Sequence, residues 1–130
     1  ALGIEALSRG DGTADFVDND ALATATAQAN LESTHFASRG RVHRMPAAAA
    51  VSRLQGPYTL VLADPPYYDE DVFGAVEAVA SSPLVDDATI VVVEHHRRET
   101  PPEALGRLPV YRTRRHGDSV VSIYALEEAP

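Results

Sequence analysis

Short runs of residues that favour β-strands alternate along the chain with longer segments of helical periodicity. The short runs predict strands at 14–17, 58–63 and 89–94. Between them, apolar residues that recur every three or four positions predict helices at about 21–36 and 70–81. Strands and helices in alternation are typical of an α/β protein with a parallel sheet built from βαβ units.

Each predicted helix has a side that we expect to face the core. Asp20 is the expected N-cap of the first helix, and Ser82-Pro83 follows the end of the second. The residues near one side of the first helix are Leu22, Ala25, Ala29 and Phe36. The corresponding stripe of the second consists of Val72, Phe73, Val76, Val79 and Ala80.

The predicted strands differ in type along the chain. The run at 58–63 is almost wholly apolar, as a strand covered on both faces is, so we expect it to be central. After residue 106 the pattern changes to two strands close in sequence, at about 108–115 and 119–126. They are joined by a predicted hairpin turn at His116-Gly117-Asp118. The sheet is therefore expected to be mostly parallel, with an antiparallel C-terminal strand.

The composition fits a globular protein. The chain has 130 residues, of which 45% are hydrophobic, enough for one domain with a core, and no repeat or low-complexity linker divides it. Its longest apolar runs are far below the roughly 18 residues of a membrane-spanning helix. The chain contains no cysteine, which excludes disulfides and thiol chemistry and fits a reducing compartment.

Charge is distributed unevenly. The net charge is −8, which argues against binding nucleic acid by bulk electrostatics. Residues 1–94 carry 5 arginines against 14 acidic residues, whereas residues 95–130 carry 6 arginines against 5. The C-terminal quarter is therefore either the side that faces a polyanion or a solvated basic face on an acidic protein.

The chemistry-bearing motif follows the expected central strand: Asp64-Pro65-Pro66-Tyr67. In open α/β sheets, ligands bind outside the carboxyl ends of the strands. Two prolines remove two N–H donors and leave a rigid segment of carbonyl acceptors, beside the carboxylate of Asp64 and the ring of Tyr67. Acceptors next to an aromatic ring suit a flat substrate that carries an amino group, such as a nucleobase.

This motif resembles the Asp/Asn-Pro-Pro-Tyr/Phe motif of class I S-adenosylmethionine-dependent amino-methyltransferases. The opening residues 1–10 are similar to the segment directly after the glycine-rich cofactor loop in one branch, the bacterial small-subunit (16S) ribosomal RNA guanine-(N2)-methyltransferases. The resemblance continues through 16–20, 91–94 and 117–124. It implies a Rossmann-like methyltransferase sheet, S-adenosylmethionine as cofactor, ribosomal RNA or the small ribosomal subunit as partner, and a cytoplasmic location.

The resemblance also implies roles for individual residues. Asp18 matches the acid that binds the cofactor's ribose hydroxyls, and Asn19 lines the adenine pocket. Pro46 and Ala47 stand where many relatives have Asp or Asn and then Ala, so an adenine contact there must come from the backbone. The full set of implied cofactor contacts is Gly3, Asp18, Asn19, Ala47 and Asp64. The implied catalytic residues are Asp64, Pro65, Pro66 and Tyr67.

The implied reaction is methyl transfer to the exocyclic amine of a guanine. Alternatives are methylation of an adenine amine in DNA or RNA, methylation of a protein glutamine, and a truncated relative that binds a partner without catalysis. Because relatives have a strand and most of the glycine loop before the position of Ala1, we expect residues 1–130 to form a single methyltransferase domain lacking its first strand. Such a segment should bind cofactor poorly by itself.

Two other kinds of chemistry are disfavoured. Glu94, His95, His96 and His116 could in principle hold a metal, but adjacent residues on a strand point to opposite faces, so we expect no metal site. The chain also lacks the Gly-x-Ser-x-Gly turn of serine hydrolases.

Overall fold

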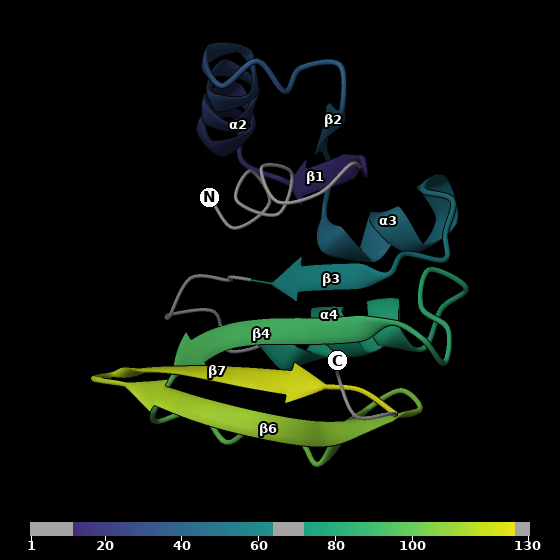
Figure 1. Ribbon diagram of the computed structural model, residues 1–130, viewed down its shortest axis with the longest axis vertical. Coiled ribbons are helices and arrows are strands. Elements are labelled where there is room, and N and C mark those ends of the chain that lie inside the picture. The colour runs from purple at the N-terminus through teal and green to yellow at the C-terminus, as the bar shows by residue number, and fades with distance from the viewer. Residues whose placement is uncertain (1–11, 64–71, 127–130) are drawn as a thin grey trace. The chain divides into compact units, whose positions relative to one another are not determined.

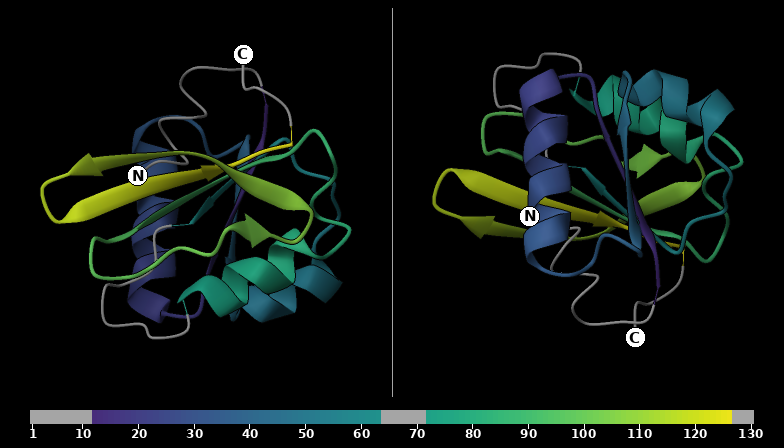
Figure 2. Two further views of the ribbon diagram at one scale, coloured as in Figure 1. Left: turned by 90° about the horizontal axis from the view of Figure 1, so that it is seen from below. Right: turned by 90° about the horizontal axis from the view of Figure 1, so that it is seen from above.

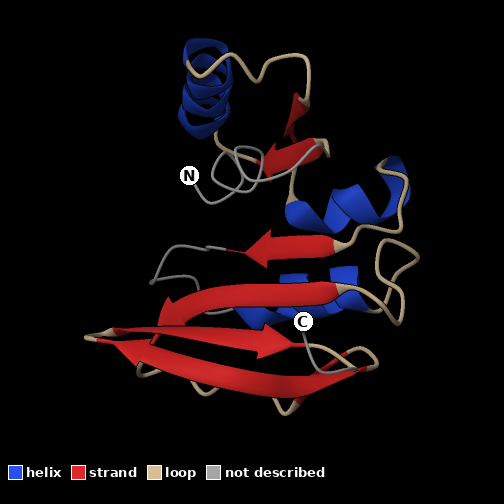
Figure 3. Ribbon diagram, viewed as in Figure 1, coloured by secondary structure: helices blue, strands red, loops and turns tan. Residues whose placement is uncertain are grey.

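The computed structural model describes residues 12–63 and 72–126, in elements that alternate between helix and strand before a strand-rich C-terminal part (Figure 3). The chain divides into two compact units, Ala1–Ala50 and Val51–Pro130, which we describe separately. The segments 1–11, 64–71 and 127–130 lie outside the described residues. No helix within the described ranges is long and apolar enough to span a membrane.

The first unit is a β-α-β arrangement. Strand β1 (Ala14–Asp18) leads into helix α2 (Ala21–Ser33), which returns the chain to strand β2 (Gly40–Arg44). The two strands are parallel, with Ala14 opposite Gly40 and Asp18 opposite Arg44. Helix α3 (Ala47–Arg53) follows β2 (Figure 1). The predicted strand at 14–17 and the helix after it are thus confirmed.

Helix α2 begins as predicted but buries a different side. The carboxylate of Asp20 accepts a hydrogen bond from the amide of Leu22 at 3.2 Å, which confirms its N-cap role. The expected core-facing position Leu22 is 73% exposed, whereas Leu31 is fully buried. The predicted stripe was therefore wrong. In an alanine-rich helix the small side chains do not define a hydrophobic face clearly. The burial of Leu31 determines which side of α2 packs.

The second unit is a five-stranded mixed sheet with one helix. Its elements are β3 (Leu60–Ala63), α4 (Val72–Ala80), β4 (Ile90–His96), β5 (Ala104–Leu105), β6 (Leu108–His116) and β7 (Ser119–Tyr124). The strand order is β3-β4-β7-β6-β5. Only β3 and β4 are parallel in this sheet; β4 with β7, β7 with β6, and β6 with β5 are antiparallel.

This topology confirms the α/β class and corrects one expectation. The sheet of this unit is mixed, and the hairpin predicted at 116–118 joins its antiparallel strands β6 and β7. Among the described strands, β3 pairs only with β4 and stands at one end of the five-stranded sheet rather than at its centre. Leu60 of β3 is 41% exposed and the other three residues are half-buried, so a continuous apolar run does not by itself show how many neighbours pair with a strand.

The core of this unit lies between α4 and one face of the sheet. The buried cluster consists of Val76, Ala80, Val85, Val91, Val93, Leu105, Leu108 and Tyr124, with Phe73 and Val79 packed against it. The stripe predicted on the second helix is confirmed at Phe73, Val76, Val79 and Ala80. Val91 and Val93 alternate with half-buried Val92 along β4, so one face of the strand meets the helix.

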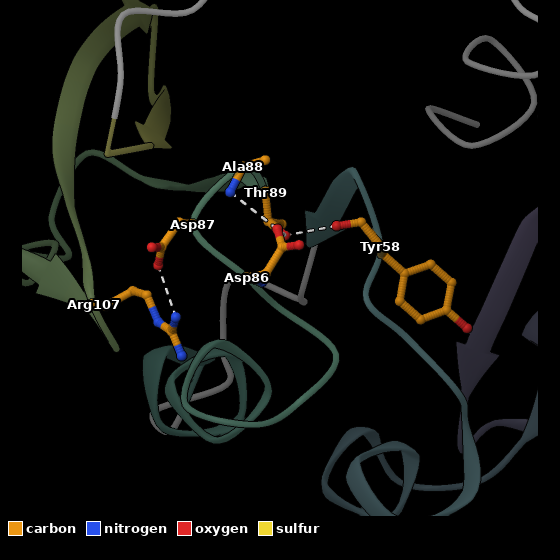
Figure 4. Close-up of polar contacts among 6 residues, drawn as sticks. All are labelled: Tyr58, Asp86, Asp87, Ala88, Thr89 and Arg107. Atoms are coloured by element: carbon orange, nitrogen blue, oxygen red, sulfur yellow. Dashed lines mark hydrogen bonds and ion pairs between the residues drawn. The ribbon is translucent and has the colours of Figure 1, made fainter.

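The amino ends of β3 and β4 are tied together by one buried threonine. The hydroxyl of Thr89 donates to the carbonyl of Tyr58 at 2.6 Å and accepts from the amide of Asp86 at 2.9 Å (Figure 4). In the same region Arg107 forms an ion pair with Asp87, 2.7 Å between Nη1 and Oδ1 (Figure 4). These contacts fix the start of the parallel pair and so the position of its carboxyl ends.

Candidate functional site

The expected cofactor residues of the first unit gather at the carboxyl ends of β1 and β2. Asp18 is the last residue of β1, and the amide of Met45, just past β2, donates to its carbonyl at 2.9 Å. Ala47 begins α3 two residues later. The structure therefore brings Asp18, Asn19 and Ala47 to one edge of the parallel pair, where α/β proteins bind their ligands.

The carboxylate of Asp18 is exposed and held in one orientation. Its Oδ1 accepts a hydrogen bond from the amide of Asp20 at 2.8 Å. No other hydrogen bond or ion pair joins its side chain to a described residue, so its remaining acceptor positions face solvent. A carboxylate fixed in this way can accept hydrogen bonds from a pair of hydroxyl groups. The same bond is also an ordinary turn contact at a strand end.

Asn19 and Ala47 contribute mainly backbone at this edge. The carbonyl of Asn19 accepts from Nε of Arg44 at 3.4 Å, which links the β1–α2 turn to the end of β2. Ala47 is exposed at the first position of α3, where a backbone amide has no acceptor within the helix, whereas the amide of Ala49 already donates to the carbonyl of Pro46 at 2.9 Å. The position can therefore offer a backbone donor but no polar side chain, as expected from Pro46-Ala47.

The carboxyl edge of the second unit is formed by β3 and β4. Ala63, the last residue of β3, is opposite Val93 in the parallel pair. The implied catalytic residues Asp64, Pro65, Pro66 and Tyr67 come directly after it and lie outside the described residues, as does Gly3. Glu94 is half-buried on β4, and no hydrogen bond or ion pair joins its carboxylate to a described residue. No catalytic role is expected for Glu94 from the sequence, and its contacts add none.

The two adjacent histidines lie on opposite faces of β4, as predicted. His95 is 1% exposed, with Nε2 2.8 Å from the hydroxyl of Ser122 and its ring edge-to-face with Phe73 at 5.2 Å between centroids. His96 is half-buried and belongs to the alternate face. Within 12–63 and 72–126, no group of three or more potential metal ligands comes together.

A feature that the sequence analysis missed is an irregularity in β6. Val110 is opposite Tyr124 of β7, but Arg112 is opposite Ile123, so Tyr111 is an extra residue in the ladder. The sequence does contain a signal of this irregularity. Every second residue is apolar at Leu108 and Val110, and the same spacing then continues with the charged residues Arg112 and Arg114. Strict alternation would have placed those arginines on the core face.

Comparison with known proteins places this fold among the Rossmann-like methyltransferases. A solved structure of a putative methyltransferase, yhhF from Escherichia coli, matches with a TM-score of 0.78 and 23% identity, over 95% of this chain and 68% of that one. A conserved hypothetical protein from Streptococcus pyogenes matches with a TM-score of 0.87 and 32% identity, over 97% and 79% of the two chains.

The family is equally clear from sequence. The model of the family described as Conserved hypothetical protein 95 matches residues 1–125, and the chain belongs to this family. A Bacillus subtilis (strain 168) protein named putative rRNA methyltransferase YlbH is 30% identical over 126 residues, which are 95% of this chain and 68% of that protein. These matches confirm, at the level of the family, the resemblance predicted from the sequence.

Proposed function

We propose that this protein transfers a methyl group from S-adenosylmethionine to the exocyclic amine of a guanine in small-subunit ribosomal RNA. The observation that carries the proposal is the end of β3, where a strand in a parallel pair leads directly into Asp64-Pro65-Pro66-Tyr67. The name of the Bacillus subtilis relative, a putative rRNA methyltransferase, supports RNA as the acceptor.

The first unit has residues that fit the cofactor. The oriented carboxylate of Asp18 would accept from the ribose hydroxyls, and the amide of Ala47 at the start of α3 would offer a backbone donor to the adenine. Asn19 would line the same pocket, and Gly3 would belong to the cofactor-binding set. When bound, the cofactor supplies an electrophilic methyl group on a sulfonium.

The second unit would supply the acceptors for the amine. A nucleobase amine is a poor nucleophile because its lone pair is delocalised into the ring. Asp64 and the carbonyl of Pro65 would accept hydrogen bonds from its two N–H groups, and these bonds strengthen as the nitrogen becomes pyramidal. Pro66 would keep this segment rigid, and Tyr67 would stack on the base once it has left its helix or loop.

The alternative functions differ from this proposal either in the group that accepts the methyl or in the absence of catalysis. Adenine amines and glutamine side chains would use the same acceptors, whereas a non-catalytic relative would neither bind cofactor nor transfer methyl groups. Incubation with tritiated methyl donor and, separately, small ribosomal subunits, free RNA, DNA and protein distinguishes these possibilities. We expect label in ribosomal RNA, as N2-methylguanine after nuclease digestion.

The decisive variant is Asp64→Ala in the full-length protein. We expect it to abolish methyl transfer and to leave most of the cofactor affinity, measured by calorimetry. The matched control is Asp87→Ala, which removes an exposed carboxylate and its surface ion pair with Arg107, a change of at most about 1 kcal/mol. The proposal fails if Asp64→Ala turns over as fast as this control.

A further inference from the structure

The outer part of β6 is an exposed, basic edge strand. Strand β5 pairs only with Leu108 and Pro109 of β6, so residues 110–116 have no strand partner on their outer side among the described residues. All of these residues are exposed. Arg112, Arg114, Arg115 and His116 fall in this stretch.

The irregularity at Tyr111 directs Arg112 and Arg114 to the face of the sheet opposite α4. Residues directly opposite each other in antiparallel strands point to the same face. Arg112 is opposite Ile123 and Arg114 is opposite Val121, whereas the core residue Tyr124 is opposite Val110. The extra residue thus allows Leu108 to be buried while both guanidinium groups leave the core side.

Neither guanidinium group is neutralised within the described chain. Arg97 is 3.0 Å from Asp118 and Arg107 is 2.7 Å from Asp87, but no ion pair joins Arg112 or Arg114 to a described carboxylate. The nearest acid in register with Arg114 is Glu94 on β4, with Val121 between them. Two strand spacings separate these positions by about 10 Å.

Arg112 also has an aromatic neighbour. Its guanidinium carbon lies 5.8 Å from the ring centroid of Tyr111, which is itself 36% exposed. Such a contact holds a guanidinium in place without cancelling its charge. The face therefore presents two cations without an ion pair, one of them oriented by its aromatic neighbour, on a chain whose net charge is −8.

The register places Arg114 across β7 from Glu94, one position beyond the end of β3, and Arg112 across β7 from Val92, one position before that end. His96, at the carboxyl end of β4, is opposite Ser119 at the start of β7, so the β6–β7 turn lies at the edge where β3 and β4 end. Figures 1 and 2 show this closed end of the hairpin projecting past β4. In the sequence, Asp64 directly follows Ala63, the last residue of β3.

We propose that Arg112 and Arg114 bind phosphate groups of the RNA backbone beside the nucleotide that is methylated. The inference rests on the proposed function and assigns a partner to a surface outside the catalytic motif. Guanidinium groups bind phosphate oxygens in bidentate fashion, and phosphate contacts set the register of a nucleic acid on a protein without reading its sequence. The competing explanation is that the charges only prevent the edge strand from pairing with other chains.

The test compares two double variants that each change the net charge from −8 to −10. One is Arg112→Gln with Arg114→Gln, and the matched control is Arg41→Gln with Arg53→Gln, two exposed arginines of β2 and α3. Binding of a short fluorescein-labelled single-stranded RNA to the full-length protein is measured by anisotropy over a range of salt. Methyl-donor affinity, the KM for RNA and kcat are measured beside it.

We expect the hairpin variant to bind RNA on the order of tenfold more weakly at ~0.1 M salt. The slope of log K against log salt should become shallower by about 1.4, since each phosphate contact to a single strand contributes about 0.7. Its KM for RNA should rise, with donor affinity and kcat at saturating RNA unchanged. Arg112→Lys with Arg114→Lys should restore most of the slope, because lysine keeps the charge.

Two results would overturn the inference. One is RNA affinity and a salt slope that match the Arg41, Arg53 control. The other is self-association of the hairpin variant in light scattering with unchanged RNA affinity of its monomer, which would assign the arginines to edge protection. Failure of the proposed function is a separate result, because it is measured by the methylation assay. Even if the wild-type protein methylates no RNA, the anisotropy data still show whether Arg112 and Arg114 bind RNA.

Discussion

Asp18 and Asp20 are two exposed carboxylates within one turn, and their contacts separate their roles. Asp20 accepts from Leu22 and caps α2, as many strand-to-helix turns do. Asp18 accepts from the amide of Asp20, and that bond leaves acceptor positions open at the carboxyl edge of β1. A carboxylate that is held in place and keeps open acceptor positions can bind a ligand. The carboxylate of an N-cap residue instead accepts from the helix amides and stabilises the helix.

This difference predicts opposite outcomes for two matched substitutions. Asp18→Asn keeps an acceptor for the amide of Asp20 but removes the charge, so cofactor affinity should fall by roughly 10- to 100-fold, the loss of about 1.5–3 kcal/mol for a charged hydrogen bond. Asp20→Asn should leave cofactor affinity unchanged, since Asn is an equally good N-cap. Calorimetric titration with S-adenosylmethionine measures both, and equal affinities for the two variants would remove Asp18 from the cofactor site.

Among elements, the packing of α2 on β2 depends on one leucine and one glycine. A Cβ added to Gly40 would lie 2.6 Å from Cδ2 of Leu31, far inside van der Waals contact. Leu31 is fully buried, so it has little freedom to move away. The close approach of the leucine to the first residue of β2 therefore requires glycine at that position.

We expect Gly40→Ala to lower the free energy of unfolding by about 1–3 kcal/mol, the usual cost of overpacking. Gly12→Ala is the control, because a Cβ there would meet nothing within 4 Å. Leu31→Val in the Gly40→Ala background should cost less than the sum of the single changes, since it removes the clashing methyl group. Urea denaturation of wild type, Gly12→Ala, Gly40→Ala, Leu31→Val and the double variant measures these differences, and strict additivity would show that the two side chains do not meet.

The sequence predicted those elements whose pattern is set by their own burial. Runs such as 89–94 and the stripe from Phe73 to Ala80 are apolar because they pack on one another, so periodicity located them. Strand β2, Gly40–Arg44, carries two arginines and a histidine in five residues and gave no such signal. Strand β5 is only two residues long, and its existence depends on β6.

The candidate site was predictable to a similar and limited degree. The sequence placed Asp18 after β1 and Asp64 after β3, because strand ends could be located from apolar runs. It could not place the arginines of β6, since their direction depends on one extra residue opposite β7. An extra residue in a strand moves every later side chain to the opposite face of the sheet. The periodicity of a single sequence does not show which residue is the extra one.

For the molecule as a whole, the net charge argues against the proposed RNA partner, whereas the distribution of charge favours it. A total of −8 suggested repulsion of nucleic acid, but a potential is set near a surface by the charges within about one Debye length, 8–10 Å at physiological salt. From 108 to 126 the only acidic residue is Asp118, and Arg97 already pairs with it. An acidic protein can therefore present a basic hairpin, and the distribution of charge carries more information than its sum.

The stability of the strand-rich unit should depend on alkaline pH through Tyr124. This residue is fully buried in the core, its hydroxyl donates to the carbonyl of Pro102 at 2.8 Å, and burial raises the pKa of Tyr124 to about 12 from 10.0. The unfolded chain therefore loses this proton first. The stabilisation is complete below pH 10 and is lost as pH rises toward 12, by about 2–3 kcal/mol in total.

Tyr124→Phe isolates this contribution. It should cost about 1 kcal/mol near neutral pH, through loss of the bond to Pro102, and should remove most of the alkaline decline. The control is Tyr111→Phe, which removes an exposed hydroxyl and should keep the wild-type decline. Denaturant unfolding of the three proteins between pH 8 and pH 12 measures the difference. If wild type and Tyr124→Phe lose stability in parallel over this range, the alkaline sensitivity comes from other groups, and Tyr124 stabilises the fold by packing alone.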